Sequence, residues 1–319
     1  MASNFLAPIL TTAIISSIEN SVFPENAKVA TVVPLDKGKP DKKDISNFKP
    51  VSLLNTFSKF YEIVIKDQLV LSMENYFSPM VSAYRKNYST QHVITRLIEE
   101  WRAHLDENFV VGAVLTDLSK AFDCIAHDLL IAKLAAYGFS NTALRYIYSY
   151  LSNLKQCVRI NNTYSSYQKI ISGVPQGSIL GPIFFNLSIN DLFFFVSNVS
   201  LHNFADDNTL SAFAETILEL IDILQSGSEI VIDWFKNNKM IVKPDKFQAI
   251  LLDKRKRGHT NQRITVGNQY IKVVSSVELL GIQIDDKLEF NLHISNICRS
   301  ASNQLNALFR LKRFLGYKE

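Results

Sequence analysis

Two adjacent carboxylates, Asp206 and Asp207, are the residues of this sequence best suited to do chemistry. They lie between apolar residues on both sides, with Phe204 before them and Leu210 after them. Because Asp and Asn are turn formers, the pattern predicts a strand, a tight turn and a second strand. Neighbouring residues of an extended segment point to opposite sides, so the two carboxylates should differ in role. Such carboxylates can bind Mg²⁺ together with substrate phosphates, although paired aspartates in solvated turns are also common.

A third carboxylate, Asp117, ends the run Phe109–Asp117, whose apolar residues are typical of a short buried strand. An aspartate between such a strand and a helix is a frequent metal ligand, and a helix cap is the alternative. Asp117 lies far before Asp206 in the chain, so only folding could bring the two together.

A glycine-rich loop precedes a segment of helical character. Three of the eleven glycines fall within residues 173–181. Glycine permits close backbone approach and unusual dihedral angles. Such a loop could seat a nucleotide, and a tight buried turn is the alternative.

Two basic stretches contain side chains that could bind phosphate. The turn at 36–44 includes Lys37 and Lys39, and lysine is a good point charge for phosphate. Composition alone favours a solvated hairpin tip there, and a grip on a triphosphate is the alternative. At 83–90, basic residues such as Arg85 alternate with tyrosines, which suits either a phosphate backbone with stacked bases or an amphipathic surface.

Periodic apolar residues predict the elements that must position these side chains. The cationic run 254–257 is expected as a solvated hairpin tip, in preference to a nuclear-import or nucleic-acid contact. Helices are expected over residues 4–20, 56–73, 93–101, 129–137, 214–236 and 292–315, and strands over 27–35, 109–117, 248–252, 264–266 and 270–274.

Composition limits the class of protein. With 319 residues, 47% of them apolar, the chain can bury a sizeable core as one large domain or a few subdomains. The net charge of +4 permits a polyanionic partner without requiring one. Three distant cysteines give no disulfide framework or zinc spacing, which favours a reducing compartment. No signal peptide is predicted, and the run 193–196 is too short to span a bilayer.

In order along the chain, these segments resemble the reverse transcriptase domain of LINE-type non-LTR retrotransposons, particularly jockey-like elements. The ordered series is more specific than any one motif. The resembling blocks are Asn47–Leu54 (fingers), 83–90 (template side), 117–123 with His127 (motif A), 173–182 (motif B), 204–207 (motif C), 234–246 (motif D) and 280–282 (primer grip).

The resemblance implies an α+β right-hand polymerase fold with an antiparallel palm sheet, flanking helices, fingers and a partial thumb. The implied division is 1–108 for the fingers and template-side region, 109–275 for the palm with part of the fingers inserted, and 276–319 for the primer grip and partial thumb. Full-length relatives have an upstream endonuclease and a longer C-terminal region, so the chain resembles a truncated piece of an element.

The implied activity is that of an RNA-directed DNA polymerase, which extends a DNA primer on an RNA template by two-metal phosphoryl transfer. Asp117, Asp206 and Asp207 would hold two Mg²⁺ ions, with Mn²⁺ as the alternative, and Asp206 ranks above Asp207. Lys246 resembles the motif D lysine, a candidate proton donor to pyrophosphate, and a solvated lysine is the alternative.

The resemblance also implies a set of residues that bind substrate. Phe122 occupies the sugar-gate position, where a bulky ring would exclude a 2′-hydroxyl. Gln176 and Gly177 would lie near the incoming nucleotide and the template. The full implied set is Lys37, Lys39, Lys49, Arg85, Leu118, Phe122, Pro175, Gln176 and Gly177.

Four positions depart from the family pattern. Lys49 stands where Arg is usual, which keeps the charge but loses the bidentate fork. Leu154 replaces a frequent Arg, Lys243 a usual Asn, and Asn87 a frequent Gly. None of the four is one of the three carboxylates, and together they are consistent with a decaying copy.

A catalytically inactive nucleic-acid-binding relic is therefore the alternative function, and a metal-dependent nuclease is less favoured, because no His or Glu near the carboxylates would activate water. The implied partners are an RNA template, a DNA primer and deoxynucleoside triphosphates, with salt-sensitive binding and no membrane partner. The family's habit of priming at a chromosomal nick implies nuclear action, with a cytoplasmic ribonucleoprotein as the alternative.

Overall fold

The computed structural model describes residues 2–118, 121–255, 259–267 and 269–312. The chain forms two compact units, and each unit is assembled from separate segments. The first unit comprises Met1–Tyr88, Leu118–Phe195 and Val231–Val242. The second comprises Ser89–Asp117, Val196–Ile230 and Lys243–Glu319.

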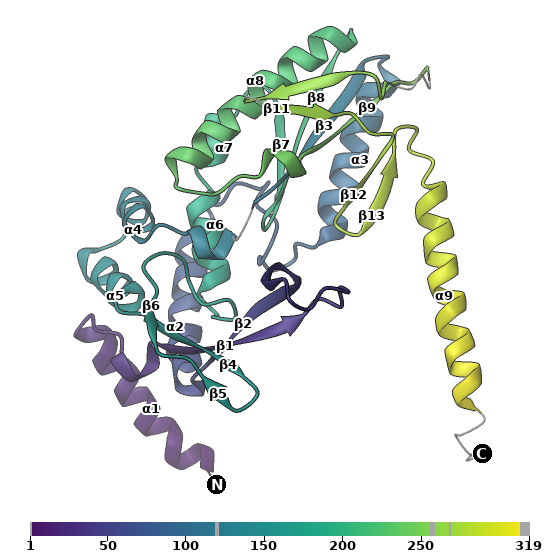
Figure 1. Cartoon of the computed structure of the whole chain (residues 1–319). Coiled ribbons are helices and arrows are strands. Elements are labelled where there is room, and N and C mark those ends of the chain that lie inside the picture. The colour runs from purple at the N-terminus through teal and green to yellow at the C-terminus, as the bar shows by residue number, and fades with distance from the viewer. Residues whose placement is uncertain (1, 119–120, 256–258, 268, 313–319) are drawn as a thin grey trace. The chain divides into compact units, whose positions relative to one another are not determined.

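The first unit contains a five-stranded sheet (Figure 1). Its central strand β1 (Val29–Asp36) pairs antiparallel with β2 (Phe48–Leu54) and parallel with β4 (Lys155–Ile160). The two short strands β5 (Thr163–Tyr164) and β6 (Gln168–Lys169) both pair with β4.

The helices of the first unit pack around a buried aromatic centre. The Phe23 ring is fully buried and meets the rings of Tyr61, Tyr146 and Tyr150 edge-on, with centroids 4.9–6.1 Å apart. Such edge-to-face pairs stabilise a core beyond the area that they bury. The helices are α1 (Ala2–Glu19), α2 (Thr56–Met73), α4 (His127–Ala136), α5 (Asn141–Leu151), α6 (Gly181–Ile189) and α7 (Leu192–Phe195), with 3₁₀ turns η1 (Glu25–Ala27), η2 (Ile45–Asn47) and η3 (Ala121–Cys124).

The second unit is built on a four-stranded antiparallel sheet with the order β7-β8-β3-β9. Its central strand β3 (Val110–Asp117) pairs with both β8 (Asp207–Ala214) and β9 (Gln248–Leu252). The edge strand β7 (Ser200–Phe204) pairs with β8. A strand with two partners and mostly buried residues matches the continuous apolar run that predicted it.

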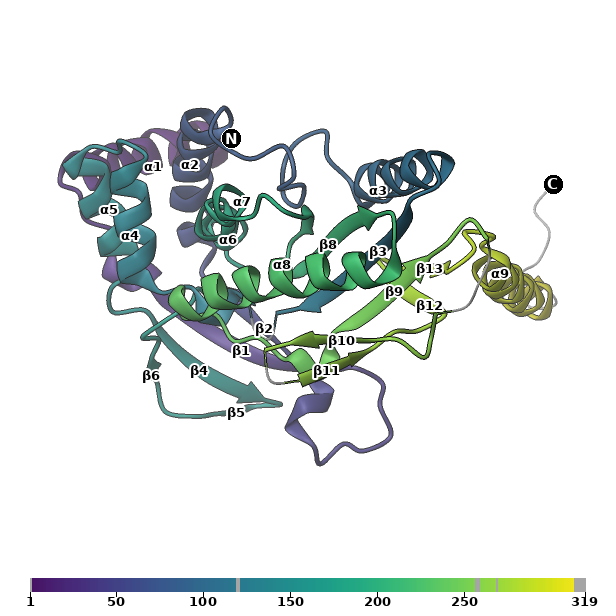
Figure 2. The ribbon, with the colours of Figure 1, turned by 90° about the horizontal axis from the view of Figure 1, so that it is seen from above.

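Two helices of this unit cover its sheet (Figure 2). From α3 (Thr90–Asp106), Leu97 and Trp101 join the apolar core with residues of β3 and β9. The α8 helix (Ile217–Asn237) enters the first unit at Val231, and its second-unit part approaches β3 at Gly112. A Cβ on Gly112 would lie 2.8 Å from a methyl of Leu224, so the glycine allows this close packing.

The rest of the second unit consists of hairpins and a long helix. The hairpins are β10 (Arg263–Val266) with β11 (Gln269–Lys272), and β12 (Ser276–Leu279) with β13 (Ile282–Asp285). The 3₁₀ turn η4 (Pro244–Lys246) precedes β9, and α9 (Asn291–Lys312) ends the described chain. Among the described helices, none is long and apolar enough to cross a membrane.

Most of the predicted elements are confirmed. The structure contains α2, α8 and β9 at the expected places, and α9 runs to Lys312, with 313–315 outside the described residues. In the cationic run, residues 254 and 255 form a turn after β9, and 256 and 257 lie outside the described residues. No element was predicted for α5 or the strands β4 to β6. The three-part division into fingers, palm and thumb stays a prediction.

Candidate functional site

The two adjacent aspartates lie at a tight turn between β7 and β8. Phe204 pairs with Asp207, which leaves Ala205 and Asp206 as the two central residues. Ala205 has φ +55°, the positive value that two-residue hairpin turns require at their first central position. The Asp206 and Asp207 side chains are both exposed. The predicted strand, turn and strand are therefore confirmed.

Two buried amides hold this turn. The Nδ2 group of Asn203 donates to the Ala205 carbonyl at 2.6 Å and to Oδ1 of Asn208 at 2.9 Å. Asn208 in turn donates from Nδ2 to the Asp206 carbonyl at 3.3 Å. Both amides are at most 1% exposed. Their hydrogen bonds hold Ala205 in a backbone conformation that alanine rarely adopts.

Strand register brings the third aspartate to the same end of the sheet. In the antiparallel pair β3–β8, Asp117 is directly opposite Asp207. Residues paired in this way have Cα atoms about 4.5–5.5 Å apart. The side chain of Asp117 lies outside the described part, so the juxtaposition is one of backbone positions. No three-residue metal cluster occurs among the side chains that are described. Oxygen donors at one sheet end nevertheless fit a hard divalent cation.

A cavity of about 570 Å³ opens beside Asp207. It is lined by residues from β3, β8, η4, β9 and the two hairpins. Lys246 of η4 and Leu280, between β12 and β13, both line it. The segment predicted as motif C, the last residues of motif D and the predicted primer grip therefore meet within the second unit. The remaining lining residues include Leu115, Thr116, Asn208, Asp245, Gln248, Lys272 and Glu278.

The glycine-rich loop belongs to the first unit, where it packs against the segment 121–127. Gly173 has φ +77°, and a Cβ there would lie 2.5 Å from Cα of Asp123. The Val174 amide donates to the Phe122 carbonyl at 3.0 Å, and Nε2 of His127 lies 2.7 Å from the Gly173 carbonyl. These contacts join the described part of motif A to motif B, while Ser119 and Lys120 lie outside the described residues.

The same loop also packs against β2. Gly177 has φ +127°, and a Cβ there would lie 2.8 Å from the Ser52 carbonyl oxygen. The Ser52 amide donates to the Gln176 carbonyl at 2.8 Å, and the Gln176 side chain donates to Asp123 at 3.3 Å. Gly173 and Gly177 therefore both allow another backbone segment to approach closely. The Gln176 side chain is oriented by the Asp123 carboxylate.

A buried carboxylate on α2, which the sequence reading missed, holds the end of this loop. Glu62 is 1% exposed and accepts from the Ile179 amide at 2.6 Å and the Leu180 amide at 3.2 Å. Burial raises the pKa of Glu62, although these hydrogen bonds oppose the rise. Burial, and then the charge of Glu62, raise the pKa of Tyr150 well above its ordinary value. A glutamate between apolar residues of a predicted helix is the signal that could have revealed it.

The remaining predicted substrate residues of the first unit differ in exposure. Phe122 is half-buried, with ring centroids 6.1 Å from Tyr84 and 5.5 Å from Phe185. Leu118 and Pro175 are buried. The lysines Lys37, Lys39 and Lys49 are exposed, and Lys37 donates to the Ser46 carbonyl at 2.9 Å.

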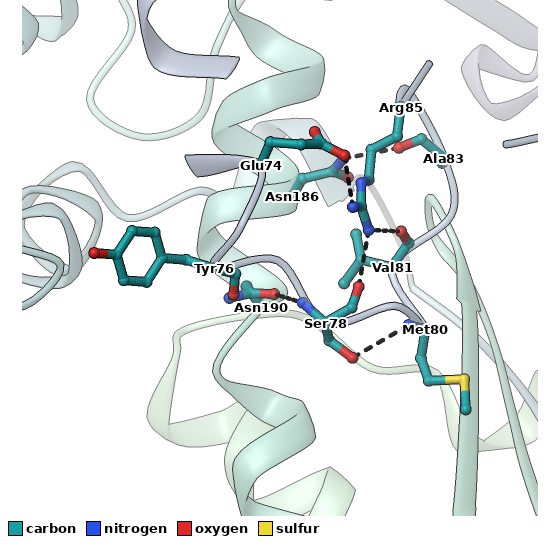
Figure 3. A network of polar contacts seen from close by, with 9 residues as sticks. All are labelled: Glu74, Tyr76, Ser78, Met80, Val81, Ala83, Arg85, Asn186 and Asn190. Atoms are coloured by element: carbon teal, nitrogen blue, oxygen red, sulfur yellow. Dashed lines mark hydrogen bonds and ion pairs between the residues drawn. The ribbon is translucent and has the colours of Figure 1, made fainter. Parts of the chain in front are cut away.

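Arg85 points into the protein (Figure 3). Its guanidinium donates to the carbonyls of Ser78 and Val81 at 3.0 Å and pairs with Glu74 at 2.7 Å. The side chain is 7% exposed. These contacts favour a structural role and give no support to the predicted contact with substrate.

Two asparagines, one in α6 and one at its C-cap, hold the loop between α2 and α3 that contains Arg85. Asn186 donates to the Ala83 carbonyl at 2.7 Å, and Asn190 donates to the Tyr76 carbonyl at 2.9 Å. The Asn190 side chain also accepts from the Ser78 amide at 2.8 Å (Figure 3). The loop between α2 and α3 is therefore fixed by buried polar side chains, as buried backbone groups require.

Comparison with known proteins places these features in a family. The family model described as reverse transcriptase (RNA-dependent DNA polymerase) matches residues 39–284. The chain is 27% identical over 296 residues to the probable RNA-directed DNA polymerase from transposon BS of Drosophila melanogaster. It is 25% identical over 306 residues to the RNA-directed DNA polymerase from mobile element jockey of the same species. These matches cover 90% and 93% of the chain but 32% of each relative, so the chain spans about a third of their length.

The fold resembles that of solved telomerase structures. Apo telomerase from Candida tropicalis aligns with a TM-score of 0.57 at 13% identity, covering 90% of this chain and 53% of that one. A form truncated from the C-terminal domain aligns with a TM-score of 0.56. The predicted α+β right-hand polymerase fold is thereby confirmed.

Proposed function

Since this chain belongs to the reverse transcriptase family, we propose that it is an RNA-directed DNA polymerase that extends a DNA primer on an RNA template. The observation that carries the proposal is the register that sets Asp117 opposite Asp207, next to Asp206 in the turn. Phosphoryl transfer needs little covalent chemistry from the protein, so positioned charge supplies most of the catalysis.

The family depends on divalent metal ions, and Asp117, Asp206 and Asp207 are the residues proposed to hold them. Two Mg²⁺ ions, with Mn²⁺ as the alternative, would stabilise the attacking and leaving oxygens. The protein's own contribution is to fix the carboxylates: the Asn203 and Asn208 amides hold the turn that presents Asp206. Lys246 lines the same cavity as Asp207 and is the proposed proton donor to the leaving pyrophosphate.

The first unit is proposed to bind the incoming deoxynucleoside triphosphate. The exposed Lys37, Lys39 and Lys49 supply positive charge for its phosphates. Phe122, which packs against two rings, is the residue proposed to exclude a 2′-hydroxyl. Gln176 is oriented by Asp123 for a contact with the nucleotide or template.

The proposed partners are an RNA template and a DNA primer, and the proposed site of action is the nucleus, with a cytoplasmic ribonucleoprotein as the alternative. Telomerase from Candida tropicalis was solved in complex with a fragment of telomeric RNA, which supports an RNA partner for this fold. A relic that binds nucleic acid without extending it is the competing function. One observation favours it: Leu154 is buried where relatives often have Arg.

Primer extension on poly(rA)·oligo(dT) with Mg²⁺ tests the proposal. Wild type should extend the primer, and Asp206→Asn should lower the rate by at least about 10²–10³, since a lost electrostatic contact at the transition state costs that much. Asp233→Asn is the control, because Asp233 is an exposed helical aspartate paired with Lys236. Folded wild type that binds template-primer without extending it would establish the relic.

A further inference from the structure

A long acid-free stretch gives the first unit an uneven charge. Between Asp128 and Asp191 the sequence has no Asp or Glu, yet it contains five Lys and Arg residues and half of the chain's twelve tyrosines. Three of these cations lie in the short strands β4, β5 and β6 and the turns between them, residues 155–169, here called the β4 ribbon. They are Lys155, Arg159 and Lys169.

Strand pairing sets the three cations of the β4 ribbon and Tyr164 on one face. Lys155 is directly opposite Lys169, and Arg159 is directly opposite Tyr164. Paired residues share a face, and so do residues separated by four positions on a strand. The ribbon therefore presents two lysines at one end and an arginine beside a tyrosine at the other.

Both ends of this face reach solvent, although Arg159 is half-buried and Cys157 between the two cations is buried, and the charge of the face is uncompensated. Lys155 and Lys169 are exposed, while Tyr164 and Tyr167 are 57% and 58% exposed. Within the described residues, no carboxylate lies at ion-pair distance from these lysines or from Arg159. Like charges directly opposite each other destabilise a strand pair, so the ribbon alone gains nothing from this arrangement.

We propose that the β4 ribbon binds the single-stranded part of the RNA template, an inference that rests on the function proposed above. Cations that track phosphates beside aromatic rings that stack on bases are the usual means of holding a single strand. Lys155, Lys169 and Arg159 contact phosphates, and Tyr164 stacks on a base. An acidic protein segment would use the cations but would have no need of an exposed ring suited to stacking.

The charge part of the proposal is tested with Lys155→Ala/Lys169→Ala. The control, Lys66→Ala/Lys236→Ala, removes two lysines from helices where each has an aspartate partner. Fluorescence anisotropy of labelled oligo(rU) over a salt series gives the affinity. The ribbon variant should lower the slope of log Kd against log salt by about 1.4, from two phosphate contacts on a single strand at about 0.7 each. The control should keep the wild-type slope.

The melting temperature of Lys155→Ala/Lys169→Ala shows whether this variant is folded. Without RNA its melting temperature should equal or exceed that of wild type, because a like-charge pair has been removed. Tyr164→Ala should weaken oligo(rU) binding by about tenfold, whereas Tyr164→Phe should bind like wild type because a phenyl ring still stacks.

Each result decides between the proposals. An unchanged affinity and salt slope in the folded lysine variant would overturn the RNA site and leave the polymerase function standing. Wild type that binds oligo(rU) but extends no primer would refute polymerase activity. The affinities of the variants would still show whether the β4 ribbon binds RNA. Wild type that fails to bind oligo(rU) would overturn the ribbon site, and primer extension on poly(rA)·oligo(dT) would still decide the polymerase function. Tyr164→Ala and Tyr164→Phe could instead bind oligo(rU) equally well, and polyglutamate could displace the labelled oligo(rU) as effectively as unlabelled RNA does. That pair of results would overturn the RNA site and show that the β4 ribbon binds an acidic protein segment.

Discussion

At the residue scale, several unusual backbone positions explain why particular side chains occur where they do. Asn87 stands where the family often has Gly, and its φ is +68°. Asn is one of the few residues other than Gly that adopts this conformation readily, so the departure preserves the backbone. Ala205 has a similar φ without that advantage, and the buried Asn203 and Asn208 amides hold it in place.

Asn203→Ala should therefore disturb the turn that presents Asp206. We expect the free energy of unfolding to fall by about 1–3 kcal/mol, since two buried hydrogen bonds are lost, and kcat for primer extension to fall more than KM rises. Asn198→Ala is the control, because Asn198 is an exposed asparagine with one side-chain partner, Ser226. Urea denaturation and steady-state extension measure the two effects, and an unchanged kcat would show that the amide does not position Asp206.

At the element scale, the loop between β6 and α6 is fixed from three sides. The segment 121–127 meets it at Gly173, β2 meets it at Gly177, and α2 contributes the Glu62 carboxylate at its end. Replacing Gly173 by any other residue would destabilise the fold, because a Cβ there would meet backbone atoms and not flexible side-chain ends. The glycine spacing thus reflects packing around the loop that is proposed to seat the nucleotide.

Glu62 should make stability depend on pH. Its folded-state pKa is raised from 4.5 by burial, so its contribution is fully present below the unfolded-state pKa and is lost as pH rises through the folded-state value. We expect the free energy of unfolding of wild type to fall relative to Glu62→Gln as pH rises above about 4.5. Urea denaturation across a pH series measures this difference. Glu219→Gln, at an exposed glutamate of α8, should track wild type. A free energy of unfolding of wild type that instead rises relative to Glu62→Gln as pH rises above about 4.5 would show that the pKa is lowered, not raised.

At the scale of the whole molecule, the chain passes repeatedly between its two units. The first unit needs β4 and α6 to complete the sheet and loop that begin with β1 and α2. The predicted fingers region, 1–108, contains β1 but not its parallel partner β4. The segments that fold together are therefore not continuous in sequence.

A fragment of residues 1–108 should accordingly fail to fold by itself. Without β4 and the glycine-rich loop, the fragment would leave an edge of β1 unpaired and would deprive Glu62 of the Ile179 and Leu180 amides, with the Ser58 hydroxyl as its remaining donor. Urea denaturation monitored by circular dichroism should show no cooperative transition, in contrast to the full chain. A cooperative transition in the fragment would show that the N-terminal region is an independent domain.

Local sequence was sufficient for much of this protein. The turn at Asp206, the helix α2, the strand β9 and the ordered motifs all depend on residues close together in the chain. Apolar periodicity and turn chemistry are short-range signals, so these features could be predicted without a structure. The family and its fold followed from the order of the motifs, and the comparisons confirmed both.

Tertiary structure decided the contacts between distant residues. Strand register set Asp117 opposite Asp207, helix packing placed Glu62 under the glycine-rich loop, and the α2–α3 loop turned Arg85 inward. The open basic face of the β4 ribbon likewise arises from pairing between short strands that periodicity does not reveal. Such contacts depend on which surfaces pack together after the chain has folded, and a motif read along the sequence does not contain that information.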